Sequence, residues 1–174
     1  EAETRRGTQL TSIYAFHIQL CTMKEEVKEL RNLYQKATSI ESAVAPPKVL
    51  GVIHESGGKM FLRQRQWTSA FNALGAAFRN YDLAGDARKL SCLQYLVVAA
   101  MLSESSMNPF DMPEAKSYQG EPEIVVMTQL FEVAGTSKSL ASKTGGSAAG
   151  AAGGSMNRQS SNKNIVRGSF HTQN

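Results

Sequence analysis

The stretch Gly58–Ala77, GKMFLRQRQWTSAFNALGAA, decides the fold of this 174-residue chain. Small and apolar residues recur in it at the spacing Gly58-x2-Phe61-x8-Ala70-x3-Leu74-x2-Ala77. Two helices that cross closely need small side chains at the crossing, and a larger residue at Ala70 should cost about 1–3 kcal/mol through overpacking. The stretch therefore predicts a pair of tightly packed helices.

The same spacing recurs when the sequence is shifted by 40 residues. One shift maps Leu10, Ile13, Ile18 and Cys21 onto Leu50, Ile53, Gly58 and Phe61, and a second maps them onto Leu90, Leu93, Val98 and Met101. Unrelated amphipathic helices would also produce some matches, and Ile18 against Gly58 is the poorest in size. The period nevertheless predicts a right-handed solenoid of tetratricopeptide-like helix pairs, an architecture that usually binds other proteins.

The period of apolar residues is helical throughout residues 1–135, so we expect an all-α fold. The predicted helices lie near residues 8–23, 26–41, 48–64, 66–83, 87–104 and 122–134. Gly85 suits the end of the fourth helix, Asp86 a cap on the fifth, and Pro122 a first turn. Residues 1–135 are the predicted helical-repeat domain, and 136–174 a disordered Gly/Ser-rich basic tail.

Three glycines stand inside the third predicted helix: Gly51, Gly57 and Gly58. Together they lower its helix propensity by about 3 kcal/mol relative to alanine. Close packing against neighbouring helices is the expected compensation.

The net charge of +4 is unevenly distributed along the chain. Residues 136–174 contain five basic residues and no acidic ones, whereas residues 1–135 contain 14 basic and 15 acidic residues. Nucleic-acid binding through the tail is an alternative function, but Phe170 is the only aromatic residue there for bases to stack on, so nucleic acid is not an expected partner.

Two basic clusters are the candidate partner-binding residues. Arg63 and Arg65 lie at a predicted helix end, and Arg88 and Lys89 at a predicted helix start. They can contact an acidic partner protein. The alternative is that they are solvated, or that the first two complement a helix dipole.

Motifs for chemistry are incomplete. Gly51 and Gly57-Gly58-Lys59 have the wrong spacing for a phosphate-binding loop, and His54-Glu55 lacks the second histidine of a zinc-protease helix. Cys21 and Cys92 are expected to be buried free thiols. We therefore predict no catalytic residue, no metal ligand and no cofactor. No segment approaches the roughly 20 apolar residues of a membrane helix, and no secretory signal is expected.

Several segments resemble a known family. They are Ala45–Pro47 (APP), Gly51–Met60 (GVIHESGGKM), Ala77–Asp82 (AFRNYD), Cys92–Val97 (CLQYLV), Asn108–Asp111 (NPFD) and Glu114–Tyr118 (EAKSY). From about Gly7 to Phe131 the chain resembles the subunit 2 family of the constitutive photomorphogenesis 9 (COP) signalosome, a PCI-domain family. A related proteasome-lid subunit is the runner-up, but that family lacks the NPFD element.

The resemblance implies a non-catalytic scaffold, found in nucleus and cytoplasm, of a complex that removes the ubiquitin-like modifier Nedd from cullins. The isopeptidase would reside in another subunit, and the implied partners are other signalosome subunits and cullin-RING ubiquitin ligases. The resemblance implies that the given sequence begins partway through the family's helical repeats and stops before the winged-helix module that anchors the subunit. We therefore expect this chain to assemble poorly with signalosome partners on its own.

Overall fold

The computed structural model describes residues 1–40, 44–103 and 108–144, with side chains as far as Thr136. The described elements are α1 (Ala2–Lys24), α2 (Val27–Thr38), α3 (Pro47–Arg63), α4 (Trp67–Leu83), α5 (Arg88–Leu102), the 3-10 helix η1 (Pro109–Asp111), α6 (Pro113–Lys116) and α7 (Pro122–Thr144). No strand occurs among these residues, so the all-α prediction is confirmed. None of the described helices is both long and apolar enough to span a membrane.

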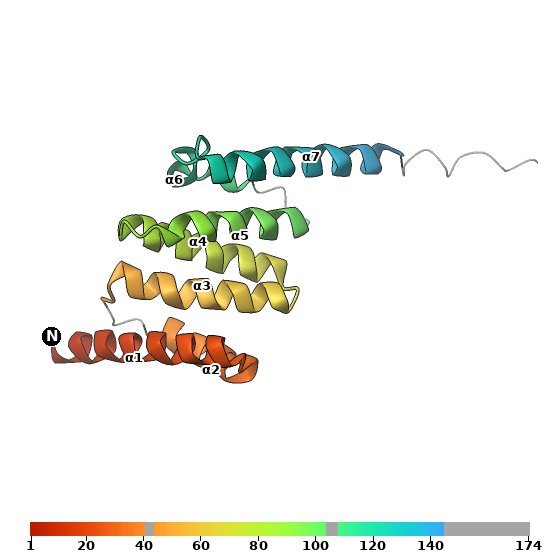
Figure 1. Cartoon of the computed structure of the whole chain (residues 1–174). Coiled ribbons are helices and arrows are strands. Elements are labelled where there is room, and N and C mark those ends of the chain that lie inside the picture. Colours follow the sequence, from red (N-terminus) through yellow and green to blue (C-terminus); the bar gives the residue numbers. More distant parts are fainter. Residues whose placement is uncertain (41–43, 104–107, 145–174) are drawn as a thin grey trace, which may run out of the picture.

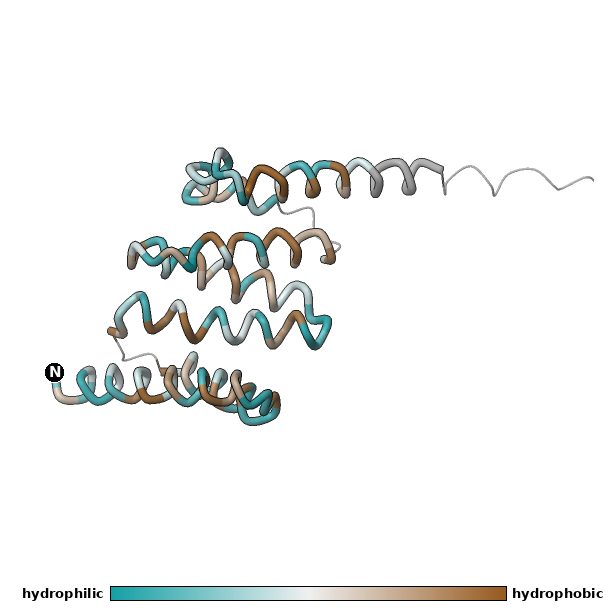
Figure 2. The backbone as a smooth tube through the Cα atoms, viewed as in Figure 1, coloured by the Kyte–Doolittle hydropathy of each residue, from teal (hydrophilic) through white to brown (hydrophobic). Residues whose placement is uncertain are grey.

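The helices form a stack that runs from α1 at one end to α7 at the other (Figure 1). Helices α1, α3, α5 and α7 pack in succession in one layer, while α2 and α4 pack against them from the other side. Hydrophobic and hydrophilic residues alternate along each helix (Figure 2). This is the arrangement of a helical-repeat stack, in which each helix contacts only its near neighbours.

The core lies between the two layers. Its largest fully buried side chains include Tyr81, Phe78, Ile53, Leu74, Leu93 and Leu96. Both cysteines are buried free thiols, as predicted. Burial raises the pKa of Cys92 to about 12 and also raises that of Cys21, so both thiols stay protonated at neutral pH.

The glycines of α3 admit side chains from α4. A Cβ at Gly51 would lie 2.6 Å from the ring of Tyr81. A Cβ at Gly58 would lie 2.6 Å from Leu74 Cγ and 3.3 Å from the backbone nitrogen of the same residue. Any larger residue at either position would push α4 away, which confirms the expected close packing.

The third glycine, Gly57, faces α2 instead. A Cβ there would overlap the ring of Tyr34. The Tyr34 ring also packs edge-on against Phe61, with centroids 5.5 Å apart, and its hydroxyl lies 3.5 Å from Nδ1 of His54. One aromatic side chain therefore joins α2 to α3.

Three connecting turns use a left-handed backbone residue. Glu25, Arg65 and Gly85 have φ values of 60°, 57° and 63°. At Gly85 the N–H donates to the Asp82 carbonyl, and the following N–H, of Asp86, donates to Tyr81, which together form a Schellman motif. The predicted end of α4 is therefore confirmed.

The residues related by the 40-residue repeat have the most similar burial in the middle of the stack, in α3 and α5. Ile53 and Leu93 are buried in α3 and α5, whereas the equivalent Ile13 of α1 is 61% exposed. Ile18 and Cys21 are buried as expected. The difference arises because α1 is the outermost described helix of its layer and is covered on one side only.

The last helix is longer than predicted. We expected it to end at residue 134 and a disordered tail to begin at 136, but α7 continues to Thr144. Residues 136–144 contain no proline or glycine, and a Gly-Gly pair follows directly after them at Gly145-Gly146. The remainder of the predicted tail, residues 145–174, lies outside the described residues.

A substitution of Gly58 by alanine should destabilise the protein by about 1–3 kcal/mol, because the added methyl group meets Leu74 and its backbone. The matched control is Gly75→Ala in α4, where a Cβ would find its nearest neighbour, Nη1 of Arg79, at 3.7 Å. This variant should be more stable than the parent by up to about 1 kcal/mol, since only helix propensity changes. Urea unfolding followed by circular dichroism at 222 nm measures both; equal effects of the two variants would contradict the packing argument.

Candidate functional site

The structure separates the four predicted partner-binding residues into two groups. Arg63 and Arg65 lie at the turn between α3 and α4, and Arg88 and Lys89 lie at the start of α5. These turns are at opposite ends of α4, which at 17 residues is about 25 Å long. The four side chains therefore do not form one patch, and their role in partner binding stays a prediction.

The first group lies on the surface. Arg63 Nη2 is 3.7 Å from a carboxylate oxygen of Glu25, and both side chains are exposed. Such a pair contributes little to stability. Arg65 is exposed in its left-handed turn. These two are the predicted residues that a partner can reach most directly.

Arg88 is held by residues of α4 and of the turn between α4 and α5. Its Nε and Nη2 donate to the two carboxylate oxygens of Asp86 at 3.2 and 3.1 Å, and its backbone N–H donates to the same carboxylate at 3.0 Å. These bonds hold the pKa of Asp86 far below its usual range and raise that of Arg88. The guanidinium also lies 4.5 Å from the ring centroid of Tyr81. The N-cap position of α5 is Ala87, without a side-chain cap bond, so Asp86 is not the N-cap residue that we expected. From one residue earlier, its carboxylate accepts the N–H of the first helical residue instead.

Lys89 forms a second internal cluster. Its Nζ donates to Tyr118 Oη at 2.6 Å and lies 3.1 Å from Asp82 Oδ1, while the Tyr118 hydroxyl donates to the same oxygen at 2.6 Å. The hydrogen bond from Tyr118, followed by Lys89, lowers the pKa of Asp82. Because Lys89 ties α5 to α4 and to the segment after α6, its first role is structural.

Glu55 is the centre of a network that the sequence did not reveal. Its Oε2 accepts the hydroxyl of Tyr81 at 2.6 Å, and its Oε1 accepts Nζ of Lys59 at 2.6 Å. Lys59 in turn lies 4.9 Å from the ring centroid of Tyr95. Burial, and then the bond to Glu55, raises the pKa of Tyr81, so its hydroxyl remains a donor. Only the i, i+4 spacing of Glu55 and Lys59 was visible in the sequence.

Two hollows flank this network on the layer of α1, α3, α5 and α7. Glu55, Lys59 and Arg88 line both of them. One, of about 410 Å³, extends to α1 at Met23, and the other, of about 480 Å³, extends to α7 at Met127. The network is therefore a charged ridge between two partly apolar recesses, a shape suited to contacts with another protein.

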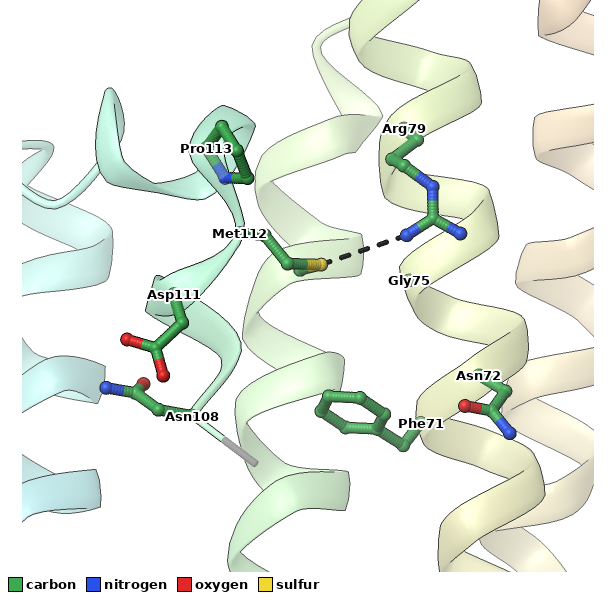
Figure 3. Close-up of a pocket in the computed structure, with 8 residues that line it drawn as sticks. All are labelled: Phe71, Asn72, Gly75, Arg79, Asn108, Asp111, Met112 and Pro113. Carbon is green, nitrogen blue, oxygen red and sulfur yellow. Dashed lines mark hydrogen bonds between the residues drawn. The ribbon is translucent and has the colours of Figure 1, made fainter. Parts of the chain in front are cut away.

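A larger groove, of about 660 Å³, lies on the other side of α4 (Figure 3). One wall is α4, with Phe71, Asn72, Gly75 and Arg79; the other is the segment around η1, with Asn108, Asp111, Met112 and Pro113. We call it the α4 groove. Arg79 reaches across it, and its Nη1 lies 3.8 Å from Sδ of Met112.

Among the residues that the structure describes, no three His, Cys, Asp or Glu side chains come together to hold a metal ion. Of the five basic residues in the predicted tail, Lys138 and Lys143 fall within α7, and the other three lie outside the described residues. The fold and its surfaces define a helical-repeat protein.

No family model matches the chain. Individual proteins do. The chain is 45% identical over 128 residues to COP9 signalosome complex subunit 2 of Dictyostelium discoideum, a match that covers 74% of this chain and 28% of that protein. The corresponding protein of Drosophila melanogaster is 46% identical over 130 residues (75% and 29%), and that of Caenorhabditis elegans 46% over 135 residues (76% and 27%). The chain therefore belongs to the subunit 2 family of the COP9 signalosome, and it spans little more than a quarter of the length of these relatives.

Replacing Tyr81 by phenylalanine should destabilise the protein by about 1–2 kcal/mol, because Glu55 loses a short hydrogen bond in a largely buried position. The control is Tyr95→Phe, which keeps the ring beneath Lys59 and should change stability by less than about 0.5 kcal/mol. Chemical unfolding of both variants tests this. If the two lose the same amount, the network around Glu55 does not stabilise the stack.

His54 should make the fold sensitive to acid. Burial, together with the charge of Arg79, lowers the pKa of His54 below 6.5, so the unfolded chain binds this proton more readily than the folded one. His54 makes its full contribution to the free energy of unfolding when the pH is above the pKa of this residue in the unfolded chain. As the pH falls below that pKa, the contribution declines, by up to about 1.4 kcal/mol at pH 5.5. Unfolding free energies at pH 7.5 and 5.5 should differ less for His54→Gln than for the parent. An unchanged difference would assign the acid sensitivity to other groups.

Proposed function

We propose that this chain acts as a non-catalytic scaffold within the COP9 signalosome. The observation that carries the proposal is its 45–46% identity, over about three quarters of its length, with subunit 2 proteins of that complex. The helical stack supports it, because such stacks present extended surfaces to other proteins. The expected partners are other signalosome subunits.

The finer part of the proposal concerns the reaction of the complex. We propose that the complex removes Nedd from cullins, that its isopeptidase resides in another subunit, and that this chain contributes to contact with cullin-RING ubiquitin ligases. The PCI character of the family and its presence in nucleus and cytoplasm belong to the same proposal. These points rest on the family resemblance of segments such as Asn108–Asp111 and Glu114–Tyr118.

Helix α1 offers a surface for such contacts. Its buried face, which includes Thr11, Ala15 and Ile18, packs on the stack. The opposite face is also apolar and consists of the exposed residues Ile13, Phe16, Leu20 and Met23. These four follow one another at intervals of three, four and three residues, so they form one stripe along the helix. We call them the α1 stripe.

The other end of the stack has a similar surface. Val126, Leu130 and Val133 are exposed on α7, at intervals of four and three residues, whereas Ile124 is buried. Apolar stripes at helical spacing are typical of surfaces that receive another helix. We propose that both end helices contact neighbouring parts of the assembled complex.

Co-expression with the remaining signalosome subunits tests the proposal. The tagged chain should co-purify those subunits in the absence of cullin, although less efficiently than a full-length subunit 2 protein. Phe16→Glu combined with Leu20→Glu should reduce recovery at least tenfold, because two charges would be buried in the contact. The control, Asn32→Glu with Gln35→Glu, adds the same charge at two exposed positions of α2 and should retain recovery.

Other results would overturn the proposal. If folded protein recovers no signalosome subunit, the scaffold role is wrong for this chain. If it recovers proteasome-lid subunits instead, the related lid family becomes the better assignment. Circular dichroism of each variant confirms folding before recovery is compared.

A further inference from the structure

Gly75 differs from the glycines of α3. Those three are required because a neighbouring side chain occupies the place of their Cβ, whereas a Cβ on Gly75 would meet only ordinary contacts, at 3.7 Å to Arg79 Nη1 and 3.9 Å to Leu96. A glycine inside a helix lowers helix stability relative to alanine. At this position the packing of the helices does not explain that loss, but the α4 groove does, since Gly75 lies in its wall.

Arg79 covers Gly75, one helical turn further along α4. Within the helices α3, α4 and α5, the other basic side chains each lie within 4 Å of a carboxylate: Lys48 and Arg88 at Asp86, Lys59 at Glu55, Arg63 at Glu25 and Lys89 at Asp82. Arg65, in the turn between α3 and α4, has no such pair in the part of the chain that the structure describes, but it does not line the α4 groove. Arg79 has no carboxylate partner among the described residues. Its only hydrogen-bond acceptor there is the sulfur of Met112, which is a weak one. Because no carboxylate of the described residues lies within 4 Å of this exposed guanidinium, Arg79 can bind the acid of a ligand.

The opposite wall limits what the acid can be. Asp111 and Asn108 lie across the groove from Arg79 (Figure 3), and the Asn108 side chain is occupied in accepting the backbone N–H of Phe110 at 3.0 Å. The groove holds one arginine and one carboxylate, whereas phosphate sites gather several cations, so a carboxylate ligand suits it better than a phosphate. Phe71 and Met112 add apolar surface on either side of the guanidinium.

We propose that the α4 groove binds an extended segment of a partner protein through one aspartate or glutamate side chain. Arg79 turns from Met112 and donates two parallel hydrogen bonds to that carboxylate. Gly75 is buried beneath Arg79, and when Arg79 turns, the missing side chain allows the segment to approach α4 closely. An apolar residue beside the acid packs on Phe71 and Met112.

This site does not depend on the scaffold function. The α1 stripe and the exposed valines and leucine of α7 lie on the end helices, whereas the α4 groove lies between α4 and the segment around η1. Loss of one contact surface therefore leaves the other intact, and the two proposals fail independently.

A phage-displayed library of random twelve-residue peptides, selected on the full chain, provides the probe. We expect enrichment of an aspartate or glutamate next to an apolar residue. A synthetic peptide of the enriched sequence should bind at least tenfold more weakly to Arg79→Gln, as measured by fluorescence anisotropy. Gly75→Ala should weaken binding at least threefold, and because this variant is expected to be more stable than the parent, misfolding will not explain the loss. Lys28→Gln removes one positive charge from an exposed position on α2 and should bind like the parent.

Four results would overturn the proposal: no enrichment, enrichment of peptides without an acid, equal binding to Arg79→Gln, or equal binding to Gly75→Ala. Tighter binding of a peptide in which phosphoserine replaces the acidic residue would also overturn it, because the groove would then be a phosphate site.

Discussion

The close approach of α3 and α4 is the constraint on which the rest of the structure depends. Without side chains at Gly51 and Gly58, α3 accepts the ring of Tyr81 and the side chain of Leu74 within its own surface. That approach brings the Tyr81 hydroxyl to Glu55 and fixes where Arg88 can lie. The buried packing and the charged ridge above it therefore have one origin.

The hairpin of α4 and α5 shows how charges of the wrong sign are accommodated. Acidic Asp82 lies near the C-terminus of α4, and basic Arg88 and Lys89 open α5, so each helix end carries the charge that its dipole disfavours. Pairing across the hairpin offsets both penalties, because Asp82 meets Lys89 and Asp86 meets Arg88. Arg88 and Lys89, which the sequence suggested as partner-binding residues, therefore first hold α4 and α5 together.

Features that depend on local spacing were predictable from the sequence. The α3 glycines indicated close packing, Gly85 the end of α4, and the 40-residue period the parallel placement of α1, α3 and α5. The charge network was not predictable, because Glu55 and Tyr81 are 26 residues apart and meet only through the fold. Arg79 gave no signal either, since its lack of a carboxylate partner is a property of three-dimensional neighbours. The change of composition after residue 135 predicts an end of α7 that is too early, because a single glycine such as Gly135 lowers helix stability without ending the helix.

The order of contacts along the stack has a consequence for folding kinetics. Each of the long helices, α1–α5 and α7, touches the next long helix in sequence or the one after it, so the separation between contacting residues is short. Chains with such low contact order fold rapidly, and the α3–α4 hairpin, which has the most extensive contact, is the natural nucleus. Growth from that hairpin outward makes α1 and α7 the last helices to order and the first to fray. We therefore expect the helices that carry the exposed apolar stripes to exchange their amide hydrogens faster than α3 and α4.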